Sequence, residues 1–204
     1  MDEIVKQAMA KWPNVPSVFG WLGLDRRGKW RIKGERIANP GVADFISRNY
    51  EHDTHGRWFF QNGPQRVFVA LDYTPFVFRT DWDADAAAPL HIEAHTGRAV
   101  HSIDGAWIDD AGIVLLATDV GVGMMDDRDL ERLLPCFTDQ HGAPLTEEAI
   151  AHAIEQLQAS GGADLYLRFR DITVPVAAIA TSDVPAKFGF VQRPVQPAGE
   201  EECY

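Results

Sequence analysis

A short turn motif occurs twice near the N-terminus of this chain. Residues 25–30 read DRRGKW and residues 53–58 read DTHGRW, so both copies follow the pattern Asp-x-x-Gly-basic-Trp. An aspartate side chain accepts hydrogen bonds from nearby backbone amides, and glycine adopts the positive φ that a tight turn needs. The motif therefore predicts two equivalent hairpin turns, each followed by a returning strand that begins with a tryptophan.

Two looser copies of the motif lie further along the chain. Residues 109–114 read DDAGIV, and residues 139–142, DQHG, keep only the turn.

On the returning strands of the first two copies, Trp30 and Trp58 are expected to be buried, because a small sheet needs large side chains in its core. Ile32 and Phe60 are expected to point inward with them at alternate positions.

The order of the predicted elements indicates an α+β fold with internal duplication. It has two similar halves, each a small antiparallel sheet covered by a helix. Residues 1–80 form an N-terminal hairpin–helix–hairpin half, and residues 90–193 form a C-terminal sheet-plus-helix half. The acidic, alanine-rich residues 81–89 are predicted to be a linker or loop. Residues 194–204, rich in Pro, Gly and Glu, are predicted to be a loose tail.

Capping residues predict where two helices begin. Asn39 precedes Pro40, which suits the first position of a helix. Thr146 caps a second predicted helix, which Gly161 ends.

The net charge of −11 argues against a nucleic-acid partner, because the summed field repels polyanions. No apolar run approaches the roughly 20 residues of a membrane span, so no membrane partner is expected. The N-terminus lacks the basic and apolar regions of a signal peptide.

Cys136 and Cys203 do not form a disulfide framework, and the expected location is the cytoplasm. No cofactor is predicted, since the glycines at 121 and 123 lack the third glycine of a dinucleotide fingerprint.

Alternating polar residues suggest one candidate metal site. His91, Glu93 and His95 would project from the same face of a strand, and His101 is close enough in sequence to be a fourth ligand. Two imidazoles and a carboxylate suit Zn²⁺, Fe²⁺ or Ni²⁺. The alternative interpretation is the polar face of an amphipathic strand.

Amide and guanidinium groups around the tip of the second predicted hairpin suggest an anion site. Such groups can bind a phosphate or a carboxylate. The candidate ligand-binding residues are Arg36, Gln61, Asn62, Gln65 and Arg66. A second basic group lies within the first hairpin and is either a solvated face or part of a small anion site. It consists of Arg26, Arg27, Lys29, Arg31, Lys33 and Arg36.

Residues 20–32 (GWLGLDRRGKWRI) and 57–67 (RWFFQNGPQRV) resemble an uncharacterised proteobacterial family, a domain of unknown function. The Asp-x-x-Gly-x-Trp hairpin is also similar to a second uncharacterised family, with a duplicated core and a C-terminal half like a pleckstrin-homology fold. That resemblance implies a nucleotide-like ligand at the interface between the halves and a signalling role. The resemblance is strongest over residues 12–79.

Three functions follow from these observations. The first is a non-enzymatic small-ligand-binding or regulatory protein, with a site for a nucleotide-like or other small anion where the two halves meet. The second is a metal-dependent hydrolase or oxygenase that uses His91, Glu93 and His95. The third is a protein–protein interaction module that uses exposed aromatic side chains and an edge strand.

Overall fold

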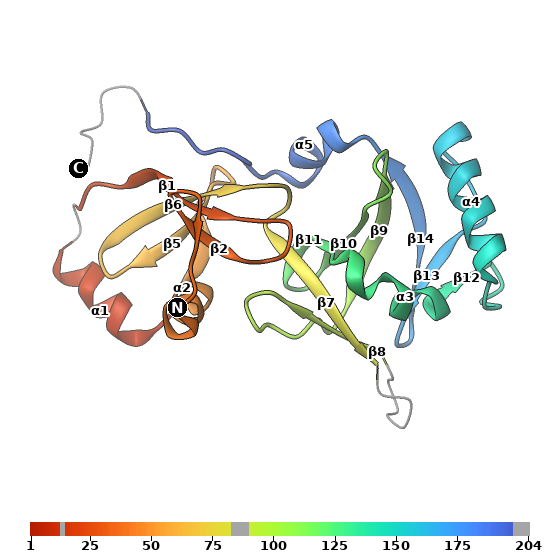
Figure 1. The fold of residues 1–204 in the computed structure, drawn as a ribbon, viewed down its shortest axis with the longest axis horizontal. Coiled ribbons are helices and arrows are strands. Elements are labelled where there is room, and N and C mark those ends of the chain that lie inside the picture. The colour runs from red at the N-terminus through yellow and green to blue at the C-terminus, as the bar shows by residue number, and fades with distance from the viewer. Residues whose placement is uncertain (13–14, 83–89, 198–204) are drawn as a thin grey trace. The chain divides into compact units, whose positions relative to one another are not determined.

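A computed structural model describes residues 1–12, 15–82 and 90–197 of the chain (Figure 1). Two compact units are present. The N-terminal unit comprises residues 1–75 together with the segment from Pro185 onward, and the inserted unit comprises residues 76–184. The predicted linker at 81–89 falls mainly on residues 83–89, and the end of the predicted tail falls on residues 198–204. Both lie outside the described residues.

The N-terminal unit is built on a six-stranded sheet with the order β3-β2-β1-β6-β5-β4. Its elements are α1 (Glu3–Lys11), β1 (Val18–Leu24), β2 (Trp30–Ile32), β3 (Glu35–Arg36), α2 (Pro40–Arg48), β4 (Tyr50–His52), β5 (Trp58–Asn62) and β6 (Gln65–Leu71). Strands β1–β3 and β4–β6 form two antiparallel groups, and β1 joins them by pairing in parallel with β6.

The inserted unit is built on an eight-stranded sheet with the order β12-β13-β14-β9-β10-β11-β7-β8. Its strands are β7 (Phe76–Trp82), β8 (Leu90–Ala94), β9 (Ile103–Asp109), β10 (Val114–Thr118), β11 (Gly121–Met125), β12 (Phe137–Thr138), β13 (Tyr166–Phe169) and β14 (Ile172–Ile179). Its helices are α3 (Leu130–Leu133) and α4 (Glu147–Ser160), and α5 (Val184–Phe188) follows β14. Helix α4 packs beside β14 (Figure 1).

The α+β class is confirmed, but the prediction of purely antiparallel sheets is wrong. Among the strands that the structure describes, three pairs are parallel: β1 with β6, β7 with β11, and β9 with β14. Each of these pairs joins strands that are far apart in the sequence, and turn motifs indicate only which neighbouring strands form hairpins. The two units also differ in strand number and strand order, and β7, expected in the first half, belongs to the second sheet.

The two predicted helix caps are present. The Asn39 side chain accepts hydrogen bonds from the first amides of α2, and Thr146 Oγ1 accepts one from Ala149 at 3.3 Å. Gly161 ends α4 with a φ of 76°. Among the helices of the described ranges, none is long and apolar enough to cross a membrane.

All four copies of the turn motif have the same hydrogen bonds. One carboxylate oxygen of each aspartate accepts from the backbone amides two and four residues later, at 2.8–3.0 Å. The glycine at the fourth position has a φ between 68° and 80° in every copy. The aspartates are Asp25, Asp53, Asp109 and Asp139. The prediction that Asp25 and Asp53 cap equivalent turns is confirmed.

The tryptophans that follow the first two turns are buried, as predicted. Trp30 is 3% exposed and Trp58 is 8% exposed. The Tyr50 ring contacts both, with centroid distances of 5.0 and 4.7 Å. The indole N–H of Trp30 donates to Ser47 Oγ on α2 at 3.0 Å, which satisfies its buried donor. Ile32 differs from its expectation, because it is 45% exposed.

The second turn is held by the C-terminal segment of its own unit. The Val191 amide donates to the Gly56 carbonyl at 2.9 Å, and the Leu71 amide donates to the Gln192 carbonyl at 2.7 Å. A Cβ atom on Gly56 would lie 2.0 Å from the Gly189 carbonyl oxygen. Gly56 is therefore required by its positive φ and by the close approach of a second backbone.

We predict that Gly56→Ala destabilises the protein more than Gly112→Ala. Both glycines have a positive φ, for which alanine costs on the order of 1 kcal/mol. Of the two, a Cβ atom would clash only at Gly56, where it meets the Gly189 carbonyl oxygen. A Cβ on Gly112 would meet nothing within 4 Å. The clash should add roughly 1–3 kcal/mol at Gly56. Urea unfolding of the two variants measures the difference, and equal losses would contradict the role of the Gly189 contact.

Candidate functional site

The N-terminal unit contains a pocket of about 300 Å³ between α2 and the face of its sheet. This volume is within the range of small-molecule sites, which are largely apolar with a few polar groups. Among the residues that the structure describes, nine apolar side chains and two amides line the pocket, and none of these lining residues is charged. They are Val18, Trp21, Leu22, Ile32, Val42, Phe45, Ile46, Phe60, Asn62, Gln65 and Val67.

A bulge in β1 shapes one wall of this pocket. The pairing of β1 with β6 changes register between Val18 and Leu22, and Gly20 has a φ of 74° within that interval. Neighbouring residues of a regular strand point to opposite faces, yet Trp21 and Leu22 both line the pocket. A bulge re-aims side chains in this way.

Three of the lining side chains are unusually exposed for their size. Trp21 is 42% exposed, Ile32 is 45% exposed and Val42 is 42% exposed. Ile32 and Val42 are not recognisable as site residues in the sequence, because they follow the same periodicity as core residues. Gly20 beside Trp21 is the signal that the sequence contains, since a glycine within a strand often marks a bulge.

The predicted anion-binding residues of the β5–β6 hairpin lie on two faces of the sheet. Asn62 pairs with Gln65 and both line the pocket, whereas Gln61 pairs with Arg66 one position away. Side chains alternate along a strand, so Gln61 and Arg66 project from the opposite face. Gln61 is 1% exposed, and its amide donates to the Gly63 carbonyl at 2.9 Å.

The predicted basic groups have local contacts within their hairpins. The Arg66 guanidinium lies 4.7 Å from the centroid of the Phe59 ring. Arg36 is an exposed residue of β3 opposite Arg31, which forms an ion pair with Asp25 at 2.9 Å. Neither Arg36 nor Arg66 is among the residues that line the pocket.

The predicted metal ligands of β8 follow the alternation of an amphipathic strand. His91 and Glu93 are exposed, while Leu90, Ile92 and Ala94 between and beside them are buried. The two polar side chains therefore share the outer face of an edge strand.

His95 and His101 lie beyond the end of β8 and have different surroundings. His95 Nδ1 accepts a hydrogen bond from the Val77 amide at 3.3 Å, which directs this nitrogen to the backbone of β7. His101 is exposed, and its amide donates to Asp119 at 2.9 Å. Within the described residues, no group of three or more His, Cys, Asp or Glu side chains is arranged to hold a metal ion. The four predicted ligands are thus not brought together.

Cys136 is 7% exposed. Burial raises the pKa of its thiol to about 11, and the nearby Arg168 lowers it only in part. A thiol with such a pKa is protonated at neutral pH and is a poor nucleophile.

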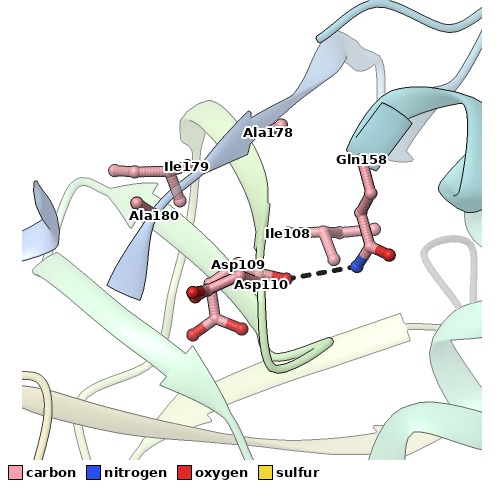
Figure 2. Close-up of a pocket in the computed structure, with 7 residues that line it drawn as sticks. All are labelled: Ile108, Asp109, Asp110, Gln158, Ala178, Ile179 and Ala180. Atoms are coloured by element: carbon pink, nitrogen blue, oxygen red, sulfur yellow. Dashed lines mark hydrogen bonds between the residues drawn. The ribbon is translucent and has the colours of Figure 1, made fainter. Parts of the chain in front are cut away.

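The inserted unit has a second pocket, of about 330 Å³, beside the turn between β9 and β10 (Figure 2). Its lining residues are Ile108, Asp109, Asp110, Gln158, Ala178, Ile179 and Ala180. Gln158 of α4 donates to the Asp109 carbonyl at 3.4 Å (Figure 2).

The carboxylates of this second pocket hold local structure. The Thr181 hydroxyl donates to Asp109 Oδ2 at 3.2 Å and also to Asp110, and the Thr181 amide donates to Asp110 at 2.9 Å. These hydrogen bonds from the side chain and the backbone of Thr181 hold the pKa of the Asp110 carboxyl below its usual 3.8. Asp109 is fully buried and caps its own turn. The carboxylates of Asp109 and Asp110 therefore hold their own turn and the segment that follows β14.

We predict that Thr181→Ala raises the pKa of Asp110 toward 3.8, because the variant removes the hydroxyl donor that favours the carboxylate. NMR titration of the side-chain carboxyls measures the change. Asp139 is the internal control, since the pKa of its carboxyl is lowered mainly by the Ala143 amide of a different turn. An unchanged Asp110 pKa would show that the backbone amide alone sets it.

The fold places the chain among mixed α+β proteins, here with two compact units. One of these units contains an apolar pocket of about 300 Å³. Residues 1–195 match the model of a family described as "Protein of unknown function (DUF2946)", and the chain belongs to that family. The expectation of an uncharacterised family is confirmed. No curated protein matches.

Two solved structures are similar to this chain. A DUF1285 family protein from Silicibacter pomeroyi DSS-3 has a TM-score of 0.55 and 14% identity, over 88% of this chain and 97% of that chain. A DUF1285 family protein from Shewanella baltica OS155 has a TM-score of 0.43 and 16% identity, over 58% of this chain and 90% of that chain. The first likeness shows a shared fold.

Proposed function

We propose that this protein is a non-enzymatic binding protein whose N-terminal unit holds a small molecule with an apolar body. The observation that carries the proposal is the lining of the pocket between α2 and the sheet. Its apolar walls come from α2 and from four neighbouring strands, and its polar groups are the amides of Asn62 and Gln65.

The chemistry of the lining determines the class of ligand body. An apolar group gains free energy when it leaves water for such walls, at about 25 cal/mol per Å² of area buried. A charged group would lose its hydration there without an opposite charge to replace it. The body of the ligand is therefore apolar, and the Asn62 amide at the β5–β6 turn can hydrogen-bond to a polar group of the ligand.

The exposed lining side chains support a ligand role over a purely structural one. Trp21, Ile32 and Val42 leave apolar area in water around the same pocket. Apolar area gathered at one place is typical of binding sites, whereas single exposed apolar residues are common everywhere. A bound molecule would remove this area from water.

We also propose a regulatory, signalling-type role in the cytoplasm, in which occupancy of the pocket is the signal.

We further propose that the β1–β2 and β4–β5 hairpins arose by duplication. Support for the duplication comes from the identical hydrogen bonds of the Asp25 and Asp53 turns and from the buried tryptophan that follows each.

A blocking variant tests the site. Val42 is on α2 at the pocket and is partly exposed, so Val42→Trp should fill the pocket without disturbing the core. Decanol is the neutral apolar probe, and calorimetry together with Trp fluorescence measures its binding. We expect the parent protein to bind decanol, and Val42→Trp to weaken binding about tenfold or more, equivalent to 1.4 kcal/mol.

The matched control is Asp44→Phe, which adds a large ring to an exposed position of the same helix that does not line the pocket. It should bind decanol as the parent does, and both variants should unfold near the parental melting temperature. A parent that binds no decanol would overturn the proposed function. Equal binding by the parent and Val42→Trp would show that the ligand lies elsewhere.

A further inference from the structure

One cation is stacked on a side chain that lines the pocket. The Lys33 ammonium lies 4.0 Å from the centroid of the Trp21 ring, and the preceding residue, Ile32, also lines the pocket. Among the described residues, no carboxylate lies within ion-pair distance of Lys33. Glu35 is the nearest acid along the hairpin, opposite Ile32, and it is exposed.

The backbone at Lys33 is in a conformation that lysine rarely adopts. Lys33 has a φ of 49° and Gly34 has a φ of 87°, which makes the two-residue loop between β2 and β3 a type I′ turn. The first position of such a turn favours asparagine, aspartate or glycine. A hydrogen bond from the Lys33 amide to the Trp21 carbonyl, at 2.7 Å, fixes the turn against β1.

A residue that local conformation disfavours suggests a role for its side chain. Here that side chain places a positive charge beside Trp21, in a protein whose net charge is −11. The walls of the pocket are apolar and uncharged, so this ammonium supplies a charge that the lining itself lacks.

We infer that the ligand of the pocket is a free amphiphilic anion, with an apolar body between α2 and the sheet and a carboxylate or phosphate head that contacts Lys33. This inference rests on the proposed function and adds the head group to it. The acidic surface of the protein disfavours large anionic assemblies, so the ligand is a dissolved molecule and not an anionic membrane. Lys33 is a specificity-determining residue that selects anions over neutral molecules with the same body.

The test compares decanoate, decanol and decyltrimethylammonium, three probes with the same chain and different head charges. Calorimetry measures the binding of each at low and high salt. For the parent, decanoate should bind about two- to fivefold more tightly than decanol, as expected for one exposed ion pair, and decyltrimethylammonium should bind most weakly. The preference for decanoate should decrease at high salt, because salt screens exposed charges.

Lys33→Asn is the informative variant, because it removes the charge and places a residue that the type I′ turn favours. It should retain the parental melting temperature and lose the preference for decanoate over decanol together with the salt dependence of that preference. Lys33→Arg should keep the preference. The matched control is Lys11→Asn, which removes another lysine stacked on a tryptophan, at 4.5 Å from the Trp12 ring, outside the pocket lining.

The outcomes separate this inference from the proposed function. Equal affinities for decanol and decanoate in the parent and in Lys33→Asn would overturn the role of Lys33 and leave the apolar pocket intact. Binding of neither probe would overturn both. Co-sedimentation with vesicles of phosphatidylglycerol and phosphatidylcholine, without binding of free decanoate, would show a membrane surface as the partner and would contradict a dissolved ligand.

Discussion

The parallel pairing of β1 with β6 is the interaction on which the N-terminal unit depends. It places Val18 opposite Val67 and joins two antiparallel groups of three strands into one sheet. Each group alone would be a small three-stranded sheet, near the lower limit for independent stability. Helix α2 packs against β5 of the joined sheet, and the pocket lies between this helix and side chains of β1, β2, β5 and β6.

The bulge in β1 and the type I′ turn between β2 and β3 act together beside that pairing. The bulge directs Trp21 to the pocket side, and the turn returns the chain so that the Lys33 amide reaches the Trp21 carbonyl. The Trp21 backbone is thus held by the hydrogen bond from Lys33, and the next residue, Leu22, pairs with Val69 of β6. A rigid backbone below a partly exposed aromatic ring is a suitable arrangement for a binding surface, because little conformational freedom is lost when a ligand contacts it.

Local chemistry made part of the fold predictable. The turns at Asp25 and Asp53, the burial of Trp30 and Trp58, and the cap at Asn39 all follow from interactions within a few residues. The parallel strand pairs did not follow, because they join segments separated by whole helices and hairpins. The inward orientation expected for Ile32 was wrong, because this residue lies at the open side of the pocket and not in the core.

The site was less predictable than the fold, for a related reason. Spacing correctly suggested that residues 61–66 form a hairpin, but the register places Gln61 and Arg66 on one face and Asn62 and Gln65 on the other. The pocket itself is composed of residues from β1, β2, α2, β5 and β6. A sequence motif cannot indicate which side chains from five separate segments meet, since that depends on the order of strands in the sheet.

The return of the chain to the N-terminal unit also has a consequence for biosynthesis. Residues 189–192 hold the Asp53 turn and the end of β6, yet the whole inserted unit separates them from that sheet in sequence. A ribosome that adds about 5–20 residues per second needs roughly 5–20 s to make residues 76–184. During this interval the nascent N-terminal sheet lacks its last contacts, and its completion waits for translation of the final segment.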